Sequence, residues 1–284
     1  MDRTEAMLEM MRNRKTWSQC SEDLNREDSK CPICNGTGFI TTVDEHGHFM
    51  AESCKCRDEE IKRRRKKFAE IPEAFRENTI DTFDVNIYKS DKAKEEIGFC
   101  MRMVMFYLEN FEDQQESGMG LYIFSKTKGS GKTRMAASIA NELLKDHQVK
   151  FATSQNILAE IKKTYERKKN FEHDRYNDEE RIETESQVLD YLITSEILII
   201  DDFGVERITG WANEKFYQII NERYISKKVT IFTSNEDVTN TGYDTRITNR
   251  IQERTYPIRF PEESVREILA ENSRNNFIMD MLRG

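Results

Sequence analysis

The stretch LYIFSKTKGSGKTRMAASIANELL, residues Leu121–Leu144, decides the fold class of this chain. It begins as a short apolar strand, passes through the loop Gly129–Thr133, and continues as a helix with one apolar face. Glycines in such a loop allow backbone N–H groups to turn inward around phosphates, and the N-terminus of the helix adds positive potential. The stretch therefore predicts a phosphate-binding loop.

Most residues of this loop have an expected contact with a bound nucleotide. Lys132 should reach the β- and γ-phosphates, and the Thr133 hydroxyl should bind Mg²⁺. Lys126 stands where the first glycine of such a loop usually lies, and lysine adopts a positive φ angle less readily than glycine. A lysine-containing turn without a ligand is the alternative. The other residues expected to contact the nucleotide are Thr127, Lys128, Gly129, Ser130, Gly131 and Arg134.

Two acids lie at the end of another apolar strand, about seventy residues after the loop. The segment ILIIDDFG places Asp201 and Asp202 at the carboxyl end of this strand, the edge where parallel sheets bind ligands. Asp201 is expected to hold Mg²⁺, directly or through water, and Asp202 to orient or deprotonate the attacking water. Two acids alone indicate only a solvated strand end, but with the upstream loop they predict an ATPase.

Alternating strand and helix patterns continue on both sides of these motifs, which is typical of a parallel sheet with crossover helices. We expect helices over residues 156–165 and 211–225, and a loop or an exposed helix over the polar stretch 166–186. The five expected strands lie at GLYIF (120–124), VKFAT (149–153), EILIIDDFG (196–204), VTIFTSN (229–235) and YPIRF (256–260).

Composition limits the possible partners and compartment. The chain has 284 residues, and its net charge of −8 gives no global basic field, so contact with nucleic acid would need a local patch. The basic run Ile61–Phe68 is either such a patch or a solvated helix face. No apolar run is long enough to span a bilayer, and the N-terminus lacks the apolar core of a secretion signal. We therefore expect a cytoplasmic protein with no membrane contact.

Four of the six cysteines are closely spaced and predict a zinc site. The segments CPIC and CKC supply Cys31, Cys34, Cys54 and Cys56, the number of thiolates that closes a tetrahedral zinc site. His46 or His48 is an alternative to one of the thiols, and four free reduced thiols are the alternative to a metal. Pro72 disfavours helix before it, which indicates a domain boundary between Phe68 and Asn78. We therefore expect a mainly helical zinc domain over residues 1–70 and an ATPase domain over 75–284.

The order of motifs after the acids resembles one family of ATPases. TIFTSN, then RITNRI, then FPEESVREIL resemble the AAA+ ATPases, and more closely the DnaC/DnaI-type helicase loaders and their relative IstB. This resemblance implies that Asn235 is sensor 1, that Arg246 is the arginine finger reaching the neighbouring subunit, and that Arg266 is sensor 2. Asp202 replaces a glutamate common in AAA+ proteins, which implies slow hydrolysis. Only about eighteen residues follow Arg266, so we expect a reduced C-terminal lid.

The zinc segment distinguishes between the members of this group. DnaI-type loaders carry an N-terminal zinc domain that docks on the replicative helicase, whereas IstB does not. The resemblance therefore implies an ATP-dependent loader of a hexameric DnaB-type helicase onto single-stranded DNA, self-associating through its AAA+ domain and using ATP or ADP, Mg²⁺ and Zn²⁺. Alternatives are an IstB-like transposition helper and a nucleotide-switched zinc adaptor with negligible hydrolysis. Candidate DNA contacts are Lys162, Lys163, Lys168 and Lys169, with Tyr165 nearby for base stacking.

Overall fold

The structure is a computed structural model that describes residues 31–43, 48–171 and 184–283. The chain divides into two compact units, with the division between Lys67 and Phe68. Each unit is described by itself below.

The first unit contains a β-hairpin next to the four clustered cysteines. Strands β1 (Phe39–Val43) and β2 (Phe49–Ser53) pair antiparallel, with Phe39 opposite Ser53. Helix α3 (Lys55–Ala69) begins directly after the hairpin. One pair of cysteines precedes the hairpin and the other follows it, so strand pairing brings the two pairs together. The helix agrees with the expected helical character of this segment, whereas the hairpin was not predicted.

The second unit is built on a five-stranded parallel sheet, as the sequence predicts. Its strand order is β4-β5-β6-β3-β7, and each neighbouring pair is parallel. The last strand begins one residue earlier than predicted. The strands are β3 (Gly120–Phe124), β4 (Val149–Thr153), β5 (Ile197–Phe203), β6 (Val229–Ser234) and β7 (Thr255–Arg259).

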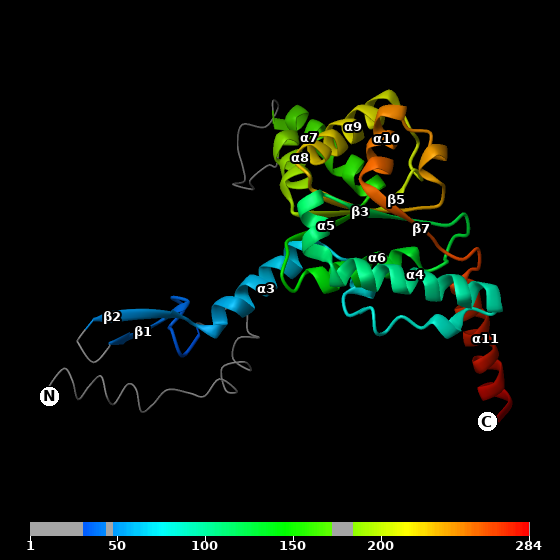
Figure 1. The fold of residues 1–284 in the computed structure, drawn as a ribbon, viewed down its shortest axis with the longest axis horizontal. Coiled ribbons are helices and arrows are strands. Elements are labelled where there is room, and N and C mark those ends of the chain that lie inside the picture. The colour runs from blue at the N-terminus through cyan, green and yellow to red at the C-terminus, as the bar shows by residue number, and fades with distance from the viewer. Residues whose placement is uncertain (1–30, 44–47, 172–183, 284) are drawn as a thin grey trace. The chain divides into compact units, whose positions relative to one another are not determined.

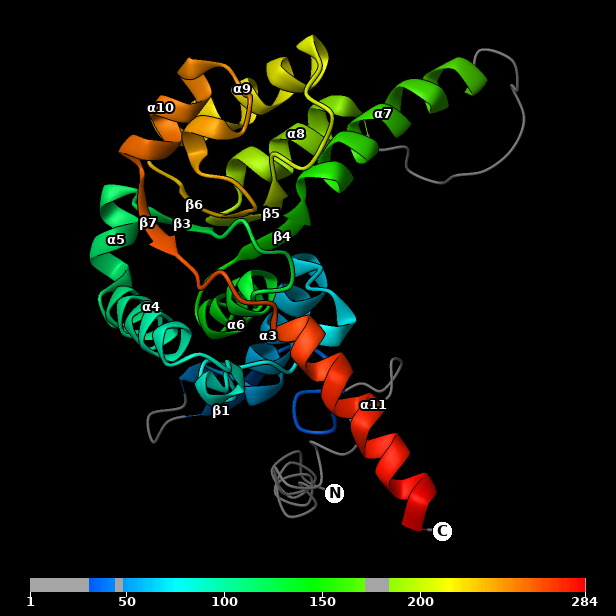
Figure 2. The same cartoon turned by 90° about the vertical axis from the view of Figure 1, so that its right-hand side faces the viewer.

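Helices cover both faces of this sheet and make a three-layered unit (Figures 1 and 2). Helices α4 (Asp91–Glu109) and α6 (Lys132–Leu143) lie on one face, and α5 (Phe111–Ser117) connects α4 to β3. The opposite face carries α7 (Ser154–Phe171), α8 (Glu185–Thr194), α9 (Gly210–Ile225) and α10 (Thr245–Glu253). Helix α7 extends beyond the predicted 156–165 into the polar stretch. The described part of the unit also contains three short 3₁₀ helices: η1 (Glu73–Phe75), η2 (Val85–Ile87) and η3 (Val238–Asn240).

The alternation of side chains along the strands divides the core into two clusters. Ile199 and Ile231 pack with α4 and α6, whereas Leu198 and Phe232 pack with the helices of the other face. Successive side chains of a strand point to opposite faces, so a continuous apolar strand such as Ile197–Ile200 supplies both clusters. The continuous apolar runs in the sequence are therefore a consequence of helices on both faces.

One helix, α11 (Val265–Arg283), follows β7 in the described part of the chain and projects from the layers (Figures 1 and 2). Among the described residues, no helix has both the length and the apolar character needed to cross a bilayer.

Candidate nucleotide site and metal centre

The carboxyl ends of β3, β5 and β6 bring the predicted nucleotide-binding residues to one edge of the sheet. The loop after β3 leads directly into α6, whose first residues are Lys132 and Thr133. The first N–H groups of a helix have no partner within the helix, and here they follow two glycines with left-handed backbone, Gly129 at φ 79° and Gly131 at φ 97°. This geometry suits the binding of phosphate oxygens.

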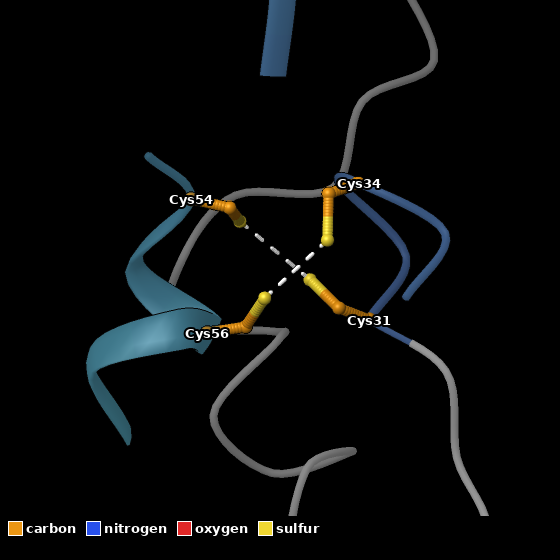
Figure 3. A group of neighbouring side chains, drawn as sticks. All are labelled: Cys31, Cys34, Cys54 and Cys56. Atoms are coloured by element: carbon orange, nitrogen blue, oxygen red, sulfur yellow. Dashed lines mark hydrogen bonds between the residues drawn. The ribbon is translucent and has the colours of Figure 1, made fainter. Parts of the chain in front are cut away.

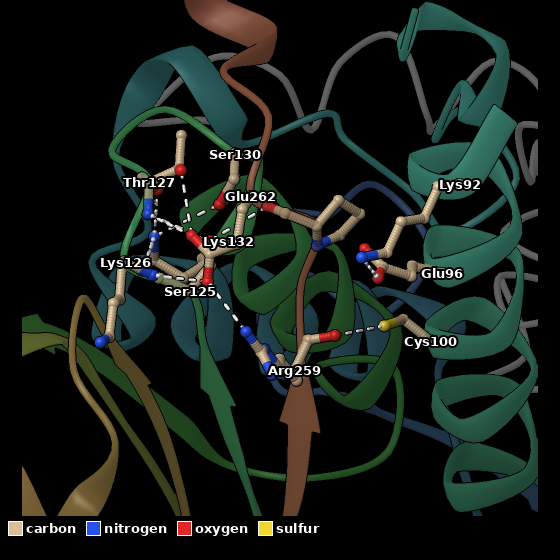
Figure 4. Close-up of polar contacts among 11 residues, drawn as sticks. Lys92, Glu96, Cys100, Ser125, Lys126, Thr127, Ser130, Lys132, Arg259 and Glu262 are labelled. Carbon is tan, nitrogen blue, oxygen red and sulfur yellow. Dashed lines mark hydrogen bonds and ion pairs between the residues drawn. The ribbon is translucent and has the colours of Figure 1, made fainter. Parts of the chain in front are cut away.

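The residue that departs from the usual loop, Lys126, fits this backbone without strain. Lys126 is not among the described residues with a positive φ angle. Its side chain is exposed and points away from the interior of the loop (Figure 4). The two positions that require glycine, 129 and 131, both have it. The loop therefore keeps the features that phosphate binding needs.

Lys132 is buried inside the loop and bonded to it (Figure 4). Its Nζ donates to Ser125 O at 3.1 Å, to Thr127 O at 3.0 Å and to Ser130 Oγ at 3.3 Å. Burial lowers the pKa of Lys132, while the nearby carboxylates of Asp202, Glu262 and Asp201 oppose this shift. The ammonium group is thus already positioned at the centre of the loop.

The two residues predicted to hold Mg²⁺ are in direct contact. The Thr133 hydroxyl donates to Asp201, with oxygen separations of 3.0 and 3.2 Å, and the Thr233 hydroxyl on β6 also donates to Asp201. Burial raises the pKa of Asp201 to about 6, and the neighbouring charge of Asp202 acts in the same direction. A hydroxyl and a carboxylate at the end of a buried strand are a suitable donor set for Mg²⁺.

The raised pKa of Asp201 leads to a prediction about stability. An aspartate whose folded pKa exceeds its unfolded value destabilises the fold above the folded pKa, because the folded protein must then hold a buried charge. We expect Asp201→Asn to stabilise the metal-free protein near neutral pH by about 1–3 kcal/mol. The gain should diminish as pH falls through about 6 towards the unfolded pKa near 4.

Urea unfolding of the two proteins at several pH values, each in chelator-treated solution, measures this difference. Both proteins share every other titrating group, so the contributions of groups that do not interact with Asp201 cancel in the comparison. An Asp201→Asn protein less stable than wild type at neutral pH would show that the Thr133 and Thr233 hydrogen bonds outweigh the buried charge.

Asp202 lies in an irregular part of its strand. The pairing of β5 with β6 shifts register between Ile200 and Phe203, and Asp202 has a left-handed backbone with φ 55°. Its N–H donates to Thr233 Oγ1 at 2.9 Å, and its carbonyl accepts from Ser154 Oγ at 2.8 Å. Aspartate adopts this conformation more readily than most residues, which is a physical reason for Asp at this position.

Three more of the predicted residues lie after β6, on α11 and on α10. Asn235 directly follows β6 and is half-buried. The backbone N–H of Arg266, on α11, donates to Gly129 O at 3.2 Å. Arg246, on α10, pairs with Asp244 at 3.0 Å and lies over the Tyr217 ring. In the described part of the chain, no hydrogen bond or ion pair joins Arg246 to the other predicted residues.

Sequence reasoning missed several residues that contact the loop. Glu262, after β7, accepts hydrogen bonds from Ser125, Lys126 and Thr127 (Figure 4). The buried Tyr88 hydroxyl donates to Ser130 O at 2.7 Å. Glu262 is more than 130 positions from the loop in sequence, and no local pattern marks it. Only the pairing of β7 with β3 could have indicated its position.

The four clustered cysteines form a compact buried group in the first unit (Figure 3). The Cys31 and Cys54 sulfurs are 3.9 Å apart, the Cys34 and Cys56 sulfurs are 3.3 Å apart, and all four lie within 4.8 Å of one another. Tetrahedral zinc with Zn–S bonds of about 2.3 Å needs sulfurs about 3.8 Å apart, so the group fits zinc. His48 is not part of the group, and His46 lies outside the described residues.

Local hydrogen bonds favour a thiolate in this group. The Gly38 N–H donates to Cys34 Sγ at 3.3 Å, within a turn in which Gly36 and Gly38 have φ angles of 85° and 76°. Burial opposes ionisation, but hydrogen bonds from Cys56 and from the backbone of Gly38 and Gly36 lower the pKa of Cys34 to about 6. A thiolate is the form of cysteine that binds zinc.

We predict that the purified protein contains one zinc ion per chain and that Cys34→Ser lowers this content sharply. Structural zinc in small domains contributes about 10–16 kcal/mol of apparent binding free energy, so chelation should unfold the first unit. Metal analysis and circular dichroism before and after chelator treatment measure both effects. Cys100→Ser is the matched control, because Cys100 is buried outside the group and contacts Arg259 O. Equal zinc in Cys34→Ser and wild type would contradict the assignment.

Comparison with known proteins supports the resemblance seen in the motifs. No protein-family model matches the chain. The replicative helicase loader DnaC of Escherichia coli K12 is 29% identical over 133 residues, which are 46% of this chain and 47% of that protein. The loader DnaI of Bacillus subtilis 168 is 27% identical over 141 residues, 47% of this chain and 40% of that protein. The chain thus spans about half the length of the curated relatives it matches.

Solved structures with the same fold include two proteins of this group. A DnaI crystal structure superposes with a TM-score of 0.50 at 24% identity, covering 72% of this chain and 100% of that one. The DnaC helicase loader structure gives a TM-score of 0.51 at 20% identity, covering 66% and 99%. The replication initiator DnaA, bound to AMPPCP and single-stranded DNA, gives 0.50 at 15% identity, covering 73% and 56%. Sequence similarity and fold together confirm that this chain resembles the DnaC/DnaI group of AAA+ proteins.

Proposed function

We propose that this protein is an ATP-dependent loader of a hexameric DnaB-type replicative helicase onto single-stranded DNA. The observation that carries the proposal is the similarity to DnaC and DnaI, together with a phosphate loop whose Thr133 contacts Asp201. The relatives named favour this function over transposition. The first unit, with its zinc group, would bind the helicase, and the second would bind nucleotide, DNA and further copies of the chain.

The second unit would bind Mg²⁺-ATP at the edge formed by β3, β5 and β6. The N–H groups of Gly129 to Thr133 would bind the phosphates, while Lys132 would compensate their charge. Thr133 and Asp201 would hold Mg²⁺, which neutralises negative charge developing on the phosphates. Asp202 would orient the attacking water, and Asn235 would hold it from the neighbouring strand end.

The geometry of Asp202 is consistent with slow hydrolysis. Its side chain is one methylene shorter than glutamate, and a displacement of about 1 Å at a reacting water can cost on the order of 100-fold in rate. The left-handed backbone at Asp202 is bonded on both sides, to Thr233 and Ser154, so the strand has little freedom to compensate. ATP would then hold loaders on the helicase for a long interval before hydrolysis releases them.

Hydrolysis would require a second copy of the chain. Arg246 is exposed and shares the Tyr217 ring with Arg250, at 4.9 and 5.2 Å from the ring centre. The bidentate contact of Arg246 with Asp244 also fixes its direction. A guanidinium group exposed on the surface is available to the ATP of a neighbouring copy, as the family resemblance implies.

We predict that Arg246→Ala binds ATP normally but shows no rise in specific ATPase activity with protein concentration. Arginine fingers contribute about 10³ to 10⁵ in rate by stabilising charge on the transferring group. Mixing Arg246→Ala with Lys132→Ala should restore some turnover, because one intact composite site forms at the shared interface. Hydrolysis by Arg246→Ala at the wild-type rate under assembling conditions would contradict the finger assignment and make Arg250 the next candidate.

Single-stranded DNA would contact α7 and α9. Lys162 Nζ lies 5.1 Å from the Trp211 ring centre, and the Tyr165 and Trp211 rings meet edge to face at 6.3 Å. Aromatic rings beside a lysine suit base stacking and phosphate contact. Trp211 is an addition to the residues predicted from sequence, whereas the side chains of Lys168 and Lys169 lie outside the described ones.

A loading assay tests the proposed function as a whole. The zinc-loaded protein should bind a DnaB-type hexamer in a pull-down and transfer it to circular single-stranded DNA only with ATP. Failure to bind any DnaB-type helicase of its host would contradict the proposal.

A further inference from the structure

Glu262 accepts hydrogen bonds from the first turn of the phosphate loop, Ser125 to Thr127. The Lys126 N–H donates to Oε1 at 3.2 Å, and the Thr127 N–H and hydroxyl donate to Oε2 at 2.9 and 3.0 Å. The Ser125 hydroxyl lies 3.1 Å from the same Oε2 and 3.0 Å from Pro261 O, so it can donate to either. One carboxylate therefore satisfies two backbone and up to two side-chain donors (Figure 4).

Two carbonyl groups of the same turn point to the other side, towards Lys132. Ser125 O and Thr127 O accept from Lys132 Nζ at 3.1 and 3.0 Å. The first turn thus lies between two charged groups. The Glu262 carboxylate accepts from its N–H groups, and the Lys132 ammonium group donates to two of its carbonyls. Because a peptide plane fixes N–H and C=O in opposite directions, the bond from the Lys126 N–H to Glu262 also orients Ser125 O, one of the two carbonyls that hold Lys132.

Glu262 is ionised in this position. Partial burial opposes its charge, but the hydrogen bonds from Lys126 and Thr127 keep the pKa of Glu262 below its usual value. Hydrogen bonds to an ionised acceptor are about twice as strong as neutral ones. The carboxylate therefore stabilises this shape of the turn more than a neutral side chain would.

A negative charge near the phosphate site also has an opposing effect, because it repels the nucleotide. The Glu262 side chain is 37% exposed, and Arg259 lies 3.8 Å from its Oε1. Solvent and this cation both weaken the repulsion. We expect the orienting effect on the loop to exceed the electrostatic one.

We propose that Glu262 is a positioning residue of the nucleotide site, which holds the first turn of the phosphate loop so that Lys132 is preset for the phosphates. This role rests on the nucleotide site of the proposed function. It also explains how the loop keeps its shape with Lys126 in place of glycine, since the turn is fixed from outside by the segment after β7.

Glu263 provides a matched control. It is the adjacent residue, and its carboxylate also accepts hydrogen bonds from a backbone segment. These come from Lys89 N, Ser90 N and Ser90 Oγ, just before the first residue of α4. Its bonds stabilise α4 and do not reach the phosphate loop. The Glu263→Ala variant therefore also loses a carboxylate that accepts backbone hydrogen bonds, but the first turn of the phosphate loop keeps its bonds to Glu262.

The test is equilibrium titration of the full-length, zinc-loaded protein with fluorescent ATP and ADP analogues in the presence of Mg²⁺. Glu262→Ala should raise both dissociation constants about tenfold, and Glu263→Ala less than about twofold, each with a cooperative thermal transition that shows an intact fold. Glu262→Gln should give an intermediate loss, because one oxygen still accepts from Thr127 while the amide group faces the Lys126 N–H.

Two results would overturn the role of Glu262. One is nucleotide binding by Glu262→Ala and Glu262→Gln that equals or exceeds wild type, which would mean that repulsion dominates. The other is an equal loss in Glu263→Ala, which would show a general effect on the fold. A wild-type protein that binds neither nucleotide would instead contradict the proposed function itself.

Discussion

Replacement of Lys132 by alanine is expected to abolish ATP-dependent loading while leaving helicase binding nearly intact. The ammonium group is buried, bonded to three loop oxygens, and is the cation at the centre of the proposed phosphate site. Loss of one partner of a buried, charge-assisted contact costs about 2–5 kcal/mol, so the affinity for ATP should fall by about 30-fold or more. Helicase binding should persist because the zinc group belongs to a separate compact unit.

Nucleotide titration and a helicase pull-down on the same preparation measure the two effects separately. Lys126→Ala is the matched control, since Lys126 is a lysine of the same loop whose side chain points outward (Figure 4). It should change ATP affinity less than about threefold, as surface substitutions usually do. A large loss in Lys126→Ala would mean that Lys126 contacts the nucleotide. Loss of helicase binding in a folded Lys132→Ala protein would contradict the assignment of helicase binding to the first unit and nucleotide binding to the second.

Replacement of Arg223 by alanine is expected to destabilise the second unit by about 3–5 kcal/mol. Arg223 is fully buried on α9, and its guanidinium group donates to carbonyl oxygens of Leu192, Ser195 and Val229 and to Thr230 Oγ1. Burial lowers the pKa of Arg223 to about 9, and the charge is stabilised by carbonyls at the C-terminus of α8. Alanine would leave these acceptors unsatisfied beside a new cavity.

Urea unfolding followed by tryptophan fluorescence measures this loss, because Trp211 lies at the start of the same helix. Arg274→Ala is the control: Arg274 is also helical and bonded to one carbonyl, Ala270 O, but it is exposed. We expect a change within about 0.5 kcal/mol for this variant. If Arg223→Ala lowers the free energy of unfolding by less than about 1 kcal/mol, water must satisfy the carbonyl oxygens as well as Arg223 does, and the prediction is wrong.

The fold class and the residues of the two candidate sites could be proposed from sequence because they depend on local patterns. A phosphate loop needs its glycines, Lys132 and Thr133 within one strand–loop–helix unit, and its shape follows from that unit alone. Zinc ligands come in close pairs for the same reason. Buried strands appear as continuous apolar runs because helices cover both faces of the sheet.

The contacts of Glu262 with the loop, of Thr233 with Asp201, and of Arg223 with the end of α8 could not be predicted in this way. Each joins residues on different elements, and a single carboxylate or hydroxyl in the sequence carries no sign of its partner. Their geometry depends on the strand order β4-β5-β6-β3-β7, which places β7 and β6 on either side of β3. The backbone conformation at Lys126 and Asp202 also depends on tertiary structure, because hydrogen bonds to residues distant in sequence fix both.

The sequence by itself determined the chemistry of this protein: a phosphate loop with Lys132, an acidic strand end with Asp201, and four thiols suited to zinc. Short-range covalent spacing decides which groups are available, so these features can be read directly. Only the tertiary structure decided how the groups are oriented and charged. Burial raises the pKa of Asp201, and Glu262 turns the first peptide groups of the loop. Both effects come from neighbours that are distant in the chain, because burial and hydrogen-bond direction exist only once the sheet has formed.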